Sequence, residues 1–277
     1  MNTVDPEALV LSVAARLAED QPYADPSPAE RDLGATGLTR LAGGDLGGAA
    51  LLLEPLGFTL ERGIDAASGK PFALAVAETD ATTQRRWGLY LVDLSAPPRL
   101  SVAVPHPRSD AHTEELGFRL WRAVPGSVLA MATVHRDAVA GTADHARATG
   151  TLFHRLWTGV LGPYGVPQVQ PHGFADVTAP EQVAVSTGTG LLTAVAVAVA
   201  DAIAATGLVT TRAWDGTAGV GLRATRNAQG IAATAAGWVW LHVEHSRSVR
   251  DDPARWHPAV DAVAAAVTAT RPGERAP

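Results

Sequence analysis

The alternation of apolar and polar positions changes character near residue 99. Beyond that point, short apolar runs typical of strands alternate with stretches of helical periodicity. The expected strands are Leu100–Val104, Val128–Val134, Gln168–Gln170, Val183–Val185, Leu208–Trp214 and Trp238–Val243. The expected helices are Asp110–Arg122, Thr151–Leu161, Leu191–Ala205 and Pro258–Thr270. Apolar strands that alternate with helices predict an α/β fold with a mostly parallel or mixed sheet and helices on both faces.

The first part of the chain carries helical and strand patterns of its own. A helix is expected at Pro6–Glu19, and two short helices are expected within Ala29–Leu56. The expected strands are Phe58–Arg62, Pro71–Ala77 and Trp87–Leu94, and the last two favour a hairpin. We therefore expect residues 1–98 to pack on or extend the main sheet, and residues 99–277 to form the main α/β domain, in one compact unit.

Polar side chains follow four of the predicted strands. His106, His135 and His172 come after three of them, and Glu244 comes after the last. The carboxyl ends of parallel strands lie at one edge of a sheet, which is where ligands bind in open α/β folds. We therefore expect these four side chains to lie close together.

Composition narrows the chemistry that such a cluster can perform. The chain has no cysteine, which excludes disulfides, thiol nucleophiles and cysteine-ligated metals. The net charge of −6 argues against a nucleic-acid partner. The most apolar stretch, Leu191–Ala200, is too short to cross a bilayer, and the N-terminus lacks the pattern of a secretory signal, so we expect a cytoplasmic protein without a membrane partner.

Histidine and carboxylate ligands point to zinc. A catalytic zinc site uses three such ligands and leaves one position open to water. His106 and His172 are the first two candidate ligands. For the third we favour Glu114, and Asp110 is the alternative because it begins the predicted helix and is also a candidate N-cap.

Glu244 is the candidate general base. It ends an apolar strand, where an unpaired carboxylate is costly, and a carboxylate that is not a ligand commonly transfers the proton in such sites. The alternative is a buried ion pair with Arg247 or Arg250.

Four further residues are candidates for contacting a substrate. Arg136 offers a bidentate clamp for a carboxylate, and His135 precedes it in the chain. Asn227 and Arg250 complete this set. We expect one zinc ion and a small-molecule or short-peptide substrate, and the sequence leaves the oligomeric state open.

Some other polar residues are weaker candidates for the site. Asp144 and His145 lie in a polar loop and are candidates to complete the site or to close over it. His242, two residues before Glu244, is interpreted as core packing. The chain contains no G-x-S-x-G nucleophile elbow, because no glycine precedes Ser186 at the required spacing.

The order of these residues resembles that of the zinc hydrolases of the phosphorylase/hydrolase-like fold. That group includes zinc carboxypeptidases, N-formylglutamate amidohydrolases and N-acetylmuramoyl-L-alanine amidases. The segments Val-Pro-His-Pro and Pro-His-Gly-Phe, around His106 and His172, look most like the N-formylglutamate amidohydrolase branch. The resemblance covers roughly residues 99 to 250. It departs from the carboxypeptidase pattern at Ser109, where that branch has its glutamate ligand.

The resemblance implies hydrolysis of an amide bond, often next to a carboxylate, with one zinc ion. The leading hypothesis is therefore a zinc-dependent amidohydrolase or peptidase. Its substrate would be a small acyl-amino acid, a γ-linked peptide or a cell-wall-type peptide. The alternatives are a binding or regulatory module that retains the fold without the chemistry, and a metal-dependent esterase or phosphoesterase.

Overall fold

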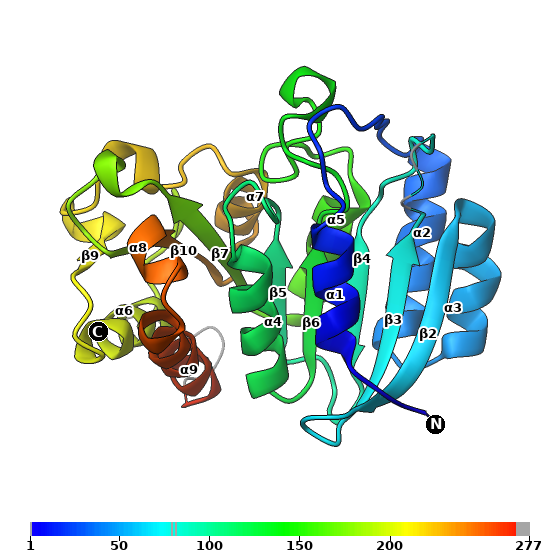
Figure 1. Ribbon diagram of the computed structural model, residues 1–277, viewed down its shortest axis with the longest axis horizontal. Coiled ribbons are helices and arrows are strands. Elements are labelled where there is room, and N and C mark those ends of the chain that lie inside the picture. Colours follow the sequence, from blue (N-terminus) through cyan, green and yellow to red (C-terminus); the bar gives the residue numbers. More distant parts are fainter. Residues whose placement is uncertain (1, 79, 81, 270–277) are drawn as a thin grey trace.

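The computed structural model describes residues 2–78, 80 and 82–269. Within these residues the chain forms a 10-stranded sheet with the order β1-β2-β3-β4-β6-β5-β7-β10-β8-β9 (Figure 1). The strands are β1 (Thr3–Val4), β2 (Phe58–Asp65), β3 (Pro71–Ala77), β4 (Leu89–Asp93), β5 (Leu100–Val104), β6 (Ser127–Met131), β7 (Gln168–Phe174), β8 (Val183–Ser186), β9 (Thr210–Arg212) and β10 (Trp240–Ser246).

The centre of the sheet is parallel and its flanks are mixed. Strands β6, β5, β7 and β10 lie side by side and run in the same direction. Strand β4 is antiparallel to β6 on one side, and β8 is antiparallel to β10 on the other. The predicted α/β class with a mixed sheet is therefore confirmed, and the carboxyl ends of the four central strands share one edge.

The strands of the first 98 residues pair into this same sheet. Strands β3 and β4 form the expected antiparallel hairpin, β2 pairs with β3, and β4 joins the sheet through β6. The segment predicted to hold two short helices contains α2 (Pro28–Ala42) and α3 (Leu46–Leu53). Helix α2 begins with a capping box in which Ser27 and Glu30 bind each other's backbone N–H groups.

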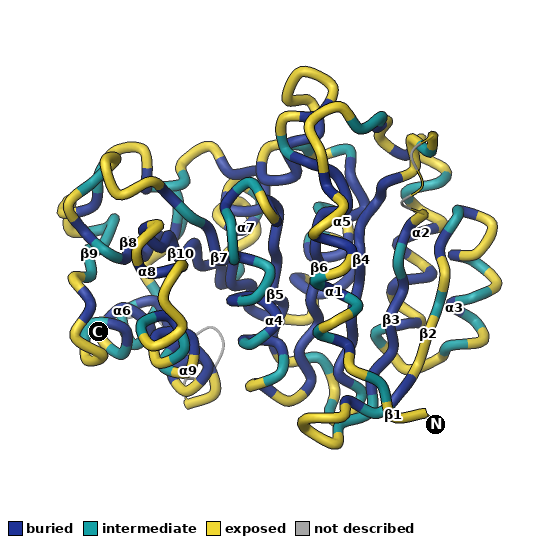
Figure 2. The backbone as a smooth tube through the Cα atoms, in the orientation of Figure 1, coloured by how far each residue is buried: buried dark blue, intermediate teal, exposed yellow. Residues whose placement is uncertain are grey.

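Helices cover both faces of the sheet, as predicted. One buried cluster joins the sheet to α1 (Pro6–Ala14), α4 (Thr113–Ala123), α6 (Ala194–Ala205) and α9 (Pro253–Ala269). A second joins the other face to α2, α3, α5 (Leu152–Arg155) and α7 (Ala228–Ala236). Strands β5 and β6 are buried along their whole length (Figure 2), which is why they read as nearly continuous apolar runs in the sequence.

Several element boundaries differ from those predicted. Helix α1 ends at Ala14 rather than Glu19, and the helix predicted at Thr151–Leu161 divides into α5 and a π-helical turn at Leu156–Leu161. Helix α9 begins at Pro253 and runs through Pro258, which is the predicted start of this helix. Its predicted end, Thr270, lies outside the described residues.

The boundary that matters most for function is the start of α4. The predicted helix begins at Asp110, but α4 begins at Thr113 after His112, whose φ of 70° is left-handed. Asp110 therefore lies in the turn between β5 and α4 rather than on a helix. No helix in the described part of the chain has the length and apolar character needed to cross a membrane.

Candidate metal centre

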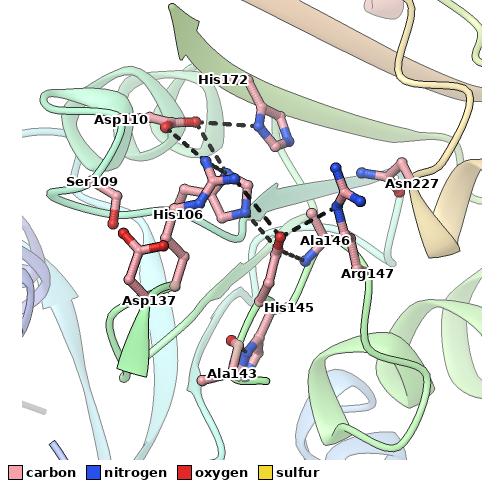
Figure 3. Close-up of polar contacts among 12 residues, drawn as sticks. His106, Ser109, Asp110, Asp137, Ala143, His145, Ala146, Arg147, His172 and Asn227 are labelled. Atoms are coloured by element: carbon pink, nitrogen blue, oxygen red, sulfur yellow. Dashed lines mark hydrogen bonds and ion pairs between the residues drawn. The ribbon is translucent and has the colours of Figure 1, made fainter. Parts of the chain in front are cut away.

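The turn after β5 brings a carboxylate back to the histidine that follows the strand. The backbone N–H of Asp110 donates to the carbonyl of His106 at 3.0 Å, and Arg108 takes a left-handed φ of 64° within the turn. As a result, Asp110 Oδ2 lies 3.1 Å from His106 Nδ1. On the other side of the same ring, His106 Nε2 lies 2.7 Å from Asp144 Oδ1 (Figure 3).

His172 approaches the same carboxylate from β7. Its Nδ1 lies 3.3 Å from Asp110 Oδ2, and the backbone N–H of Gly173 donates to that oxygen at 3.3 Å. The other ring nitrogen, Nε2, lies 3.3 Å from Gln170 Oε1. Figure 3 shows the Asp110 carboxylate directed at both imidazoles. One donor atom from each of His106, Asp110 and His172 lies within 4.8 Å of the others, and all three residues are buried.

These distances and donor types fit a zinc ion. Two ligand atoms bound to zinc at a tetrahedral angle lie about 3.3 Å apart, and the two nitrogen–carboxylate distances are 3.1 and 3.3 Å. Asp144 Oδ1 and Gln170 Oε1 lie 2.7 and 3.3 Å from the Nε2 atoms of the two histidines, an arrangement that would orient both rings with Nδ1 toward a bound ion. Two imidazole nitrogens and one carboxylate oxygen form a common zinc donor set.

The carboxylates of Asp110 and Asp144 favour positive charge in this cluster. Burial lowers the pKa of His106, but its hydrogen bonds with Asp110 and Asp144 outweigh this and raise the pKa to about 9. Burial likewise lowers the pKa of His172, with the nearby charge of His106 adding to the effect. Two ionised carboxylates around one imidazole are stabilised either by a proton or by a divalent cation.

Glu244 lies beside this cluster. It is the register partner of His172 in the pairing of β10 with β7, and it is only 8% exposed. Its Oε2 has no hydrogen-bond partner among the described residues, while Oε1 lies 3.6 Å from His242 Nε2. Burial, together with the negative charge of Asp110, raises the pKa of Glu244 to about 8. A carboxyl group with such a pKa can accept and release a proton near neutral pH.

A cavity of about 350 Å³ opens above these groups. Its lining includes the three candidate ligands, Glu244, and basic side chains from the segment between β6 and α5 and from the segment before α7. These basic residues are Arg136, Arg147 and Arg226. Arg136 Nη1 lies 3.4 Å from Asp110 Oδ1, and Arg147 Nε lies 3.5 Å from Asp144 Oδ2. The cavity is therefore lined by both carboxylate and guanidinium groups.

Of the two candidate third ligands, the structure brings Asp110 into the cluster and not Glu114. Glu114 Oε2 accepts a hydrogen bond from the backbone N–H of Arg108 at 3.2 Å, and Glu114 does not line the cavity. The preference for Glu114 assumed that it shared a helical face with Asp110, which the start of α4 at Thr113 removes.

The four predicted substrate residues lie in different environments. Arg136 and Asn227 line the cavity, and Asn227 Nδ2 donates to Gln170 Oε1 at 2.8 Å. His135 lies outside the lining and its Nε2 contacts Ser109 Oγ at 2.9 Å. Arg250 is buried outside the lining and donates to backbone carbonyls.

Two residues of the site were not recognised in the sequence. Gln170 orients His172, and His242, which was interpreted as core packing, lines the cavity with its ring centroid 4.1 Å from that of His172. Each stands two residues before a site residue on the same strand. Because side chains two apart share a strand face, this spacing was the signal that could have identified both.

Comparisons with known proteins add a structural likeness. No protein-family model and no curated protein matches the sequence. Solved structures do match, and they include proteins described as a hydrolase, a metallo-carboxypeptidase and an aspartoacylase family protein. A bacteriophage poly-gamma-glutamate hydrolase is 17% identical over 64% of this chain and 87% of its own, with a TM-score of 0.42. A metallo-carboxypeptidase from Burkholderia cenocepacia is 14% identical over 80% of this chain and 68% of its own, with a TM-score of 0.42.

A third match is an aspartoacylase family protein from Mesorhizobium loti. It is 10% identical over 75% of this chain and 67% of its own, with a TM-score of 0.41. All three TM-scores are below 0.5, so these likenesses assign no function to this chain.

Proposed function

We propose that this protein is a zinc-dependent hydrolase of an amide bond in a small acyl-amino acid, a γ-linked peptide or a cell-wall-type peptide. One observation carries the proposal. Asp110 lies against the Nδ1 atoms of two buried histidines, His106 and His172, and lines one cavity with them and with Glu244, whose Oε2 has no hydrogen-bond partner among the described residues.

In this proposal His106, Asp110 and His172 hold one zinc ion. When bound, zinc acts as a Lewis acid and lowers the pKa of a bound water molecule to near neutrality. Asp144 and Gln170 fix the orientation of the two imidazoles by accepting their Nε2–H protons.

Glu244 moves the proton. Its Oε2 accepts a proton from the attacking water and then delivers it to the nitrogen of the leaving amine, so that the carboxylate is regenerated. The burial of Glu244 supports this role because water exclusion keeps its pKa within reach of neutral pH. Neighbouring His242, 3.6 Å away, limits the positions open to the carboxylate.

The arginines bind the charged part of the substrate. Arg136 contacts the cluster on its cavity side and offers a planar, bidentate fork to a substrate carboxylate. Arg147 and Arg226 extend the positive charge to the rim of the cavity. This charge favours substrates with an acidic group near the scissile amide.

The test combines metal analysis with a substrate panel. Purified protein is expected to carry about one zinc per chain, and His106→Ala combined with His172→Ala is expected to lose it, whereas His257→Ala, outside the cavity, retains it. Glu244→Gln is expected to keep zinc and lose at least a hundredfold in kcat on N-acyl amino acids and γ-linked peptides. Protein without metal, and without thermal stabilisation by added zinc, would contradict the proposal. Hydrolysis of esters but not of amides would contradict the amide assignment and indicate an esterase.

A further inference from the structure

Arg250, at the end of α8 (Arg247–Arg250), ties three separate segments together. Its side chain is buried, with 4% of the residue exposed. Nε donates to the carbonyl of His245 at 3.1 Å, Nη2 donates to the carbonyl of Phe174 at 3.1 Å, and Nη1 donates to the carbonyl of Ala111. All three acceptors belong to the backbone, so the side chain holds chain segments rather than a single partner side chain.

Each of these carbonyls lies one or two residues beyond a residue of the candidate metal centre. The pairs are Asp110 with Ala111, His172 with Phe174, and Glu244 with His245. The three segments come from the turn after β5 and from the ends of β7 and β10. A single guanidinium group therefore connects all three parts of the chain that supply the carboxylate ligand, the second histidine and the proposed general base.

The chemistry of this contact requires arginine. Among the described residues, no carboxylate forms an ion pair with Arg250, so its buried charge is met by carbonyl oxygens. A guanidinium has five N–H donors in a fixed plane and can reach three carbonyls in set directions. A lysine ammonium at the same position is a point charge on a flexible stem and cannot span them.

Gly173 provides the space for this group. A Cβ built on Gly173 would overlap the guanidinium of Arg250. Glycine inside a strand is unfavourable unless another group approaches closely, and here the close approach is that of Arg250 to β7. The backbone N–H of Gly173 also donates to Asp110 Oδ2, so the same residue contacts both the positioning group and the carboxylate ligand.

We propose that Arg250 is a positioning residue that sets the distance between Asp110 and His172 by holding the backbone segments that carry them. It thereby fixes the geometry of the centre without touching substrate or metal. The inference rests on the proposed function in taking these two residues as zinc ligands.

Two variants test this from opposite sides of the contact. Arg250→Lys removes two of the three directed hydrogen bonds, and Gly173→Ala displaces the guanidinium while keeping Arg250. Both are expected to weaken zinc binding by roughly 10–100-fold, the range for partners that orient metal ligands. Both are also expected to speed hydrogen exchange at the backbone amide of residue 173, because its bond to Asp110 opens. Zinc affinity is measured by competition with a chelator, and amide exchange is measured on the metal-free protein.

Matched controls separate positioning from general damage. Gly47→Ala places a Cβ where no atom lies within 4 Å, and Arg119→Lys alters an exposed ion pair with Asp261. Both controls are expected to keep wild-type zinc affinity and wild-type exchange at residue 173. A lower Tm in the two test variants with unchanged zinc affinity and unchanged exchange would overturn the inference, because a purely structural role predicts that result.

The exchange measurement also separates this inference from the proposed function. If the wild-type protein binds no zinc, the proposed function fails, but exchange at residue 173 in metal-free Arg250→Lys still decides whether Arg250 holds Asp110 against β7. Unchanged exchange in both test variants overturns the inference whatever the outcome of the zinc experiment.

Discussion

At the scale of single residues, Asp110 organises the candidate metal centre. Burial alone would raise its pKa, but hydrogen bonds with His106 and His172 hold the pKa of this carboxyl well below its usual value. Asp110 therefore stays ionised across the physiological range, and a fixed negative charge between two neutral or protonated imidazoles attracts a cation. Because Asp110 lies in a turn and not on a helix, its carboxylate reaches the rings of both His106 and His172.

Asp144 supports the centre through His106. Removing its carboxylate in Asp144→Ala leaves His106 Nε2 without its acceptor at 2.7 Å, so the ring loses its orienting bond. We expect zinc affinity to fall roughly 10–100-fold, as is typical when a carboxylate that accepts a hydrogen bond from a metal-bound histidine is removed. The measurement is a zinc competition titration, with Asp201→Ala on the exposed face of α6 as the control. Equal zinc affinities for Asp144→Ala and wild type would show that Asp144 does not support zinc binding.

At the scale of elements, α4 packs closely on β5, the strand that leads into the turn with Asp110. Gly117 in α4 faces β5, and a Cβ at this position would overlap Val104 Cγ2. Val104 ends β5, two residues before His106. The glycine lets the helix approach the strand that leads into the turn with Asp110.

Gly117→Ala is therefore expected to destabilise the protein. Overpacking of a tight contact costs about 1–3 kcal/mol, although alanine is the better helix former. Gly47→Ala in α3, where the new Cβ meets no atom within 4 Å, is expected to be neutral or stabilising by up to about 1 kcal/mol. Urea unfolding of both variants measures the difference. An equal or higher stability for Gly117→Ala would show that α4 does not constrain β5 in this way.

The sequence predicted the elements of the central sheet better than their ends. Apolar runs indicated the strands. His106, His172 and Glu244 were expected at one edge because the carboxyl ends of parallel strands lie together, and the parallel pairing of β5, β7 and β10 agrees with this. The preference for Glu114 over Asp110 depended on the first residue of α4, which a left-handed His112 fixes, and the structure brings Asp110 rather than Glu114 to the two histidines. Non-glycine residues rarely adopt that conformation, and the sequence around His112 does not predict it.

At the scale of the whole molecule, the candidate site lies where the four central parallel strands end, and the first 98 residues continue the sheet on the far side of β6. The cavity forms between the loops that follow β5 and β6 and the segment that precedes α7. Burial of several histidines around this region links the stability of the whole fold to pH.

His154 in α5 offers a clear case. Burial and the charges of Arg31 and Arg155 lower the pKa of His154 to about 4, whereas an unfolded chain titrates near 6.5. The unfolded state therefore takes up a proton first as the pH falls below 6.5, and the fold loses the stability that it has at higher pH. Between pH 7 and pH 5 the wild type is expected to lose about 1–2 kcal/mol relative to His154→Gln.

Urea unfolding of both proteins at a series of pH values measures this difference. His154→Gln is the suitable comparison because glutamine keeps an acceptor for Gln229 Nε2, which lies 3.2 Å from His154 Nδ1. A stability difference that is independent of pH between 5 and 7 would show that His154 titrates alike in the folded and unfolded states.

The account depends most on the identity of the three metal ligands. An anomalous difference map at the zinc edge, from crystals of the zinc-loaded protein, tests this directly. We predict one strong peak bonded to His106 Nδ1, Asp110 Oδ2 and His172 Nδ1, at about 2.0–2.2 Å from each. A peak at His172, His242 and Glu244, or at Glu19, His135 and Asp137, which are the other groups able to hold a metal among the described residues, would contradict the account, as would the absence of any peak.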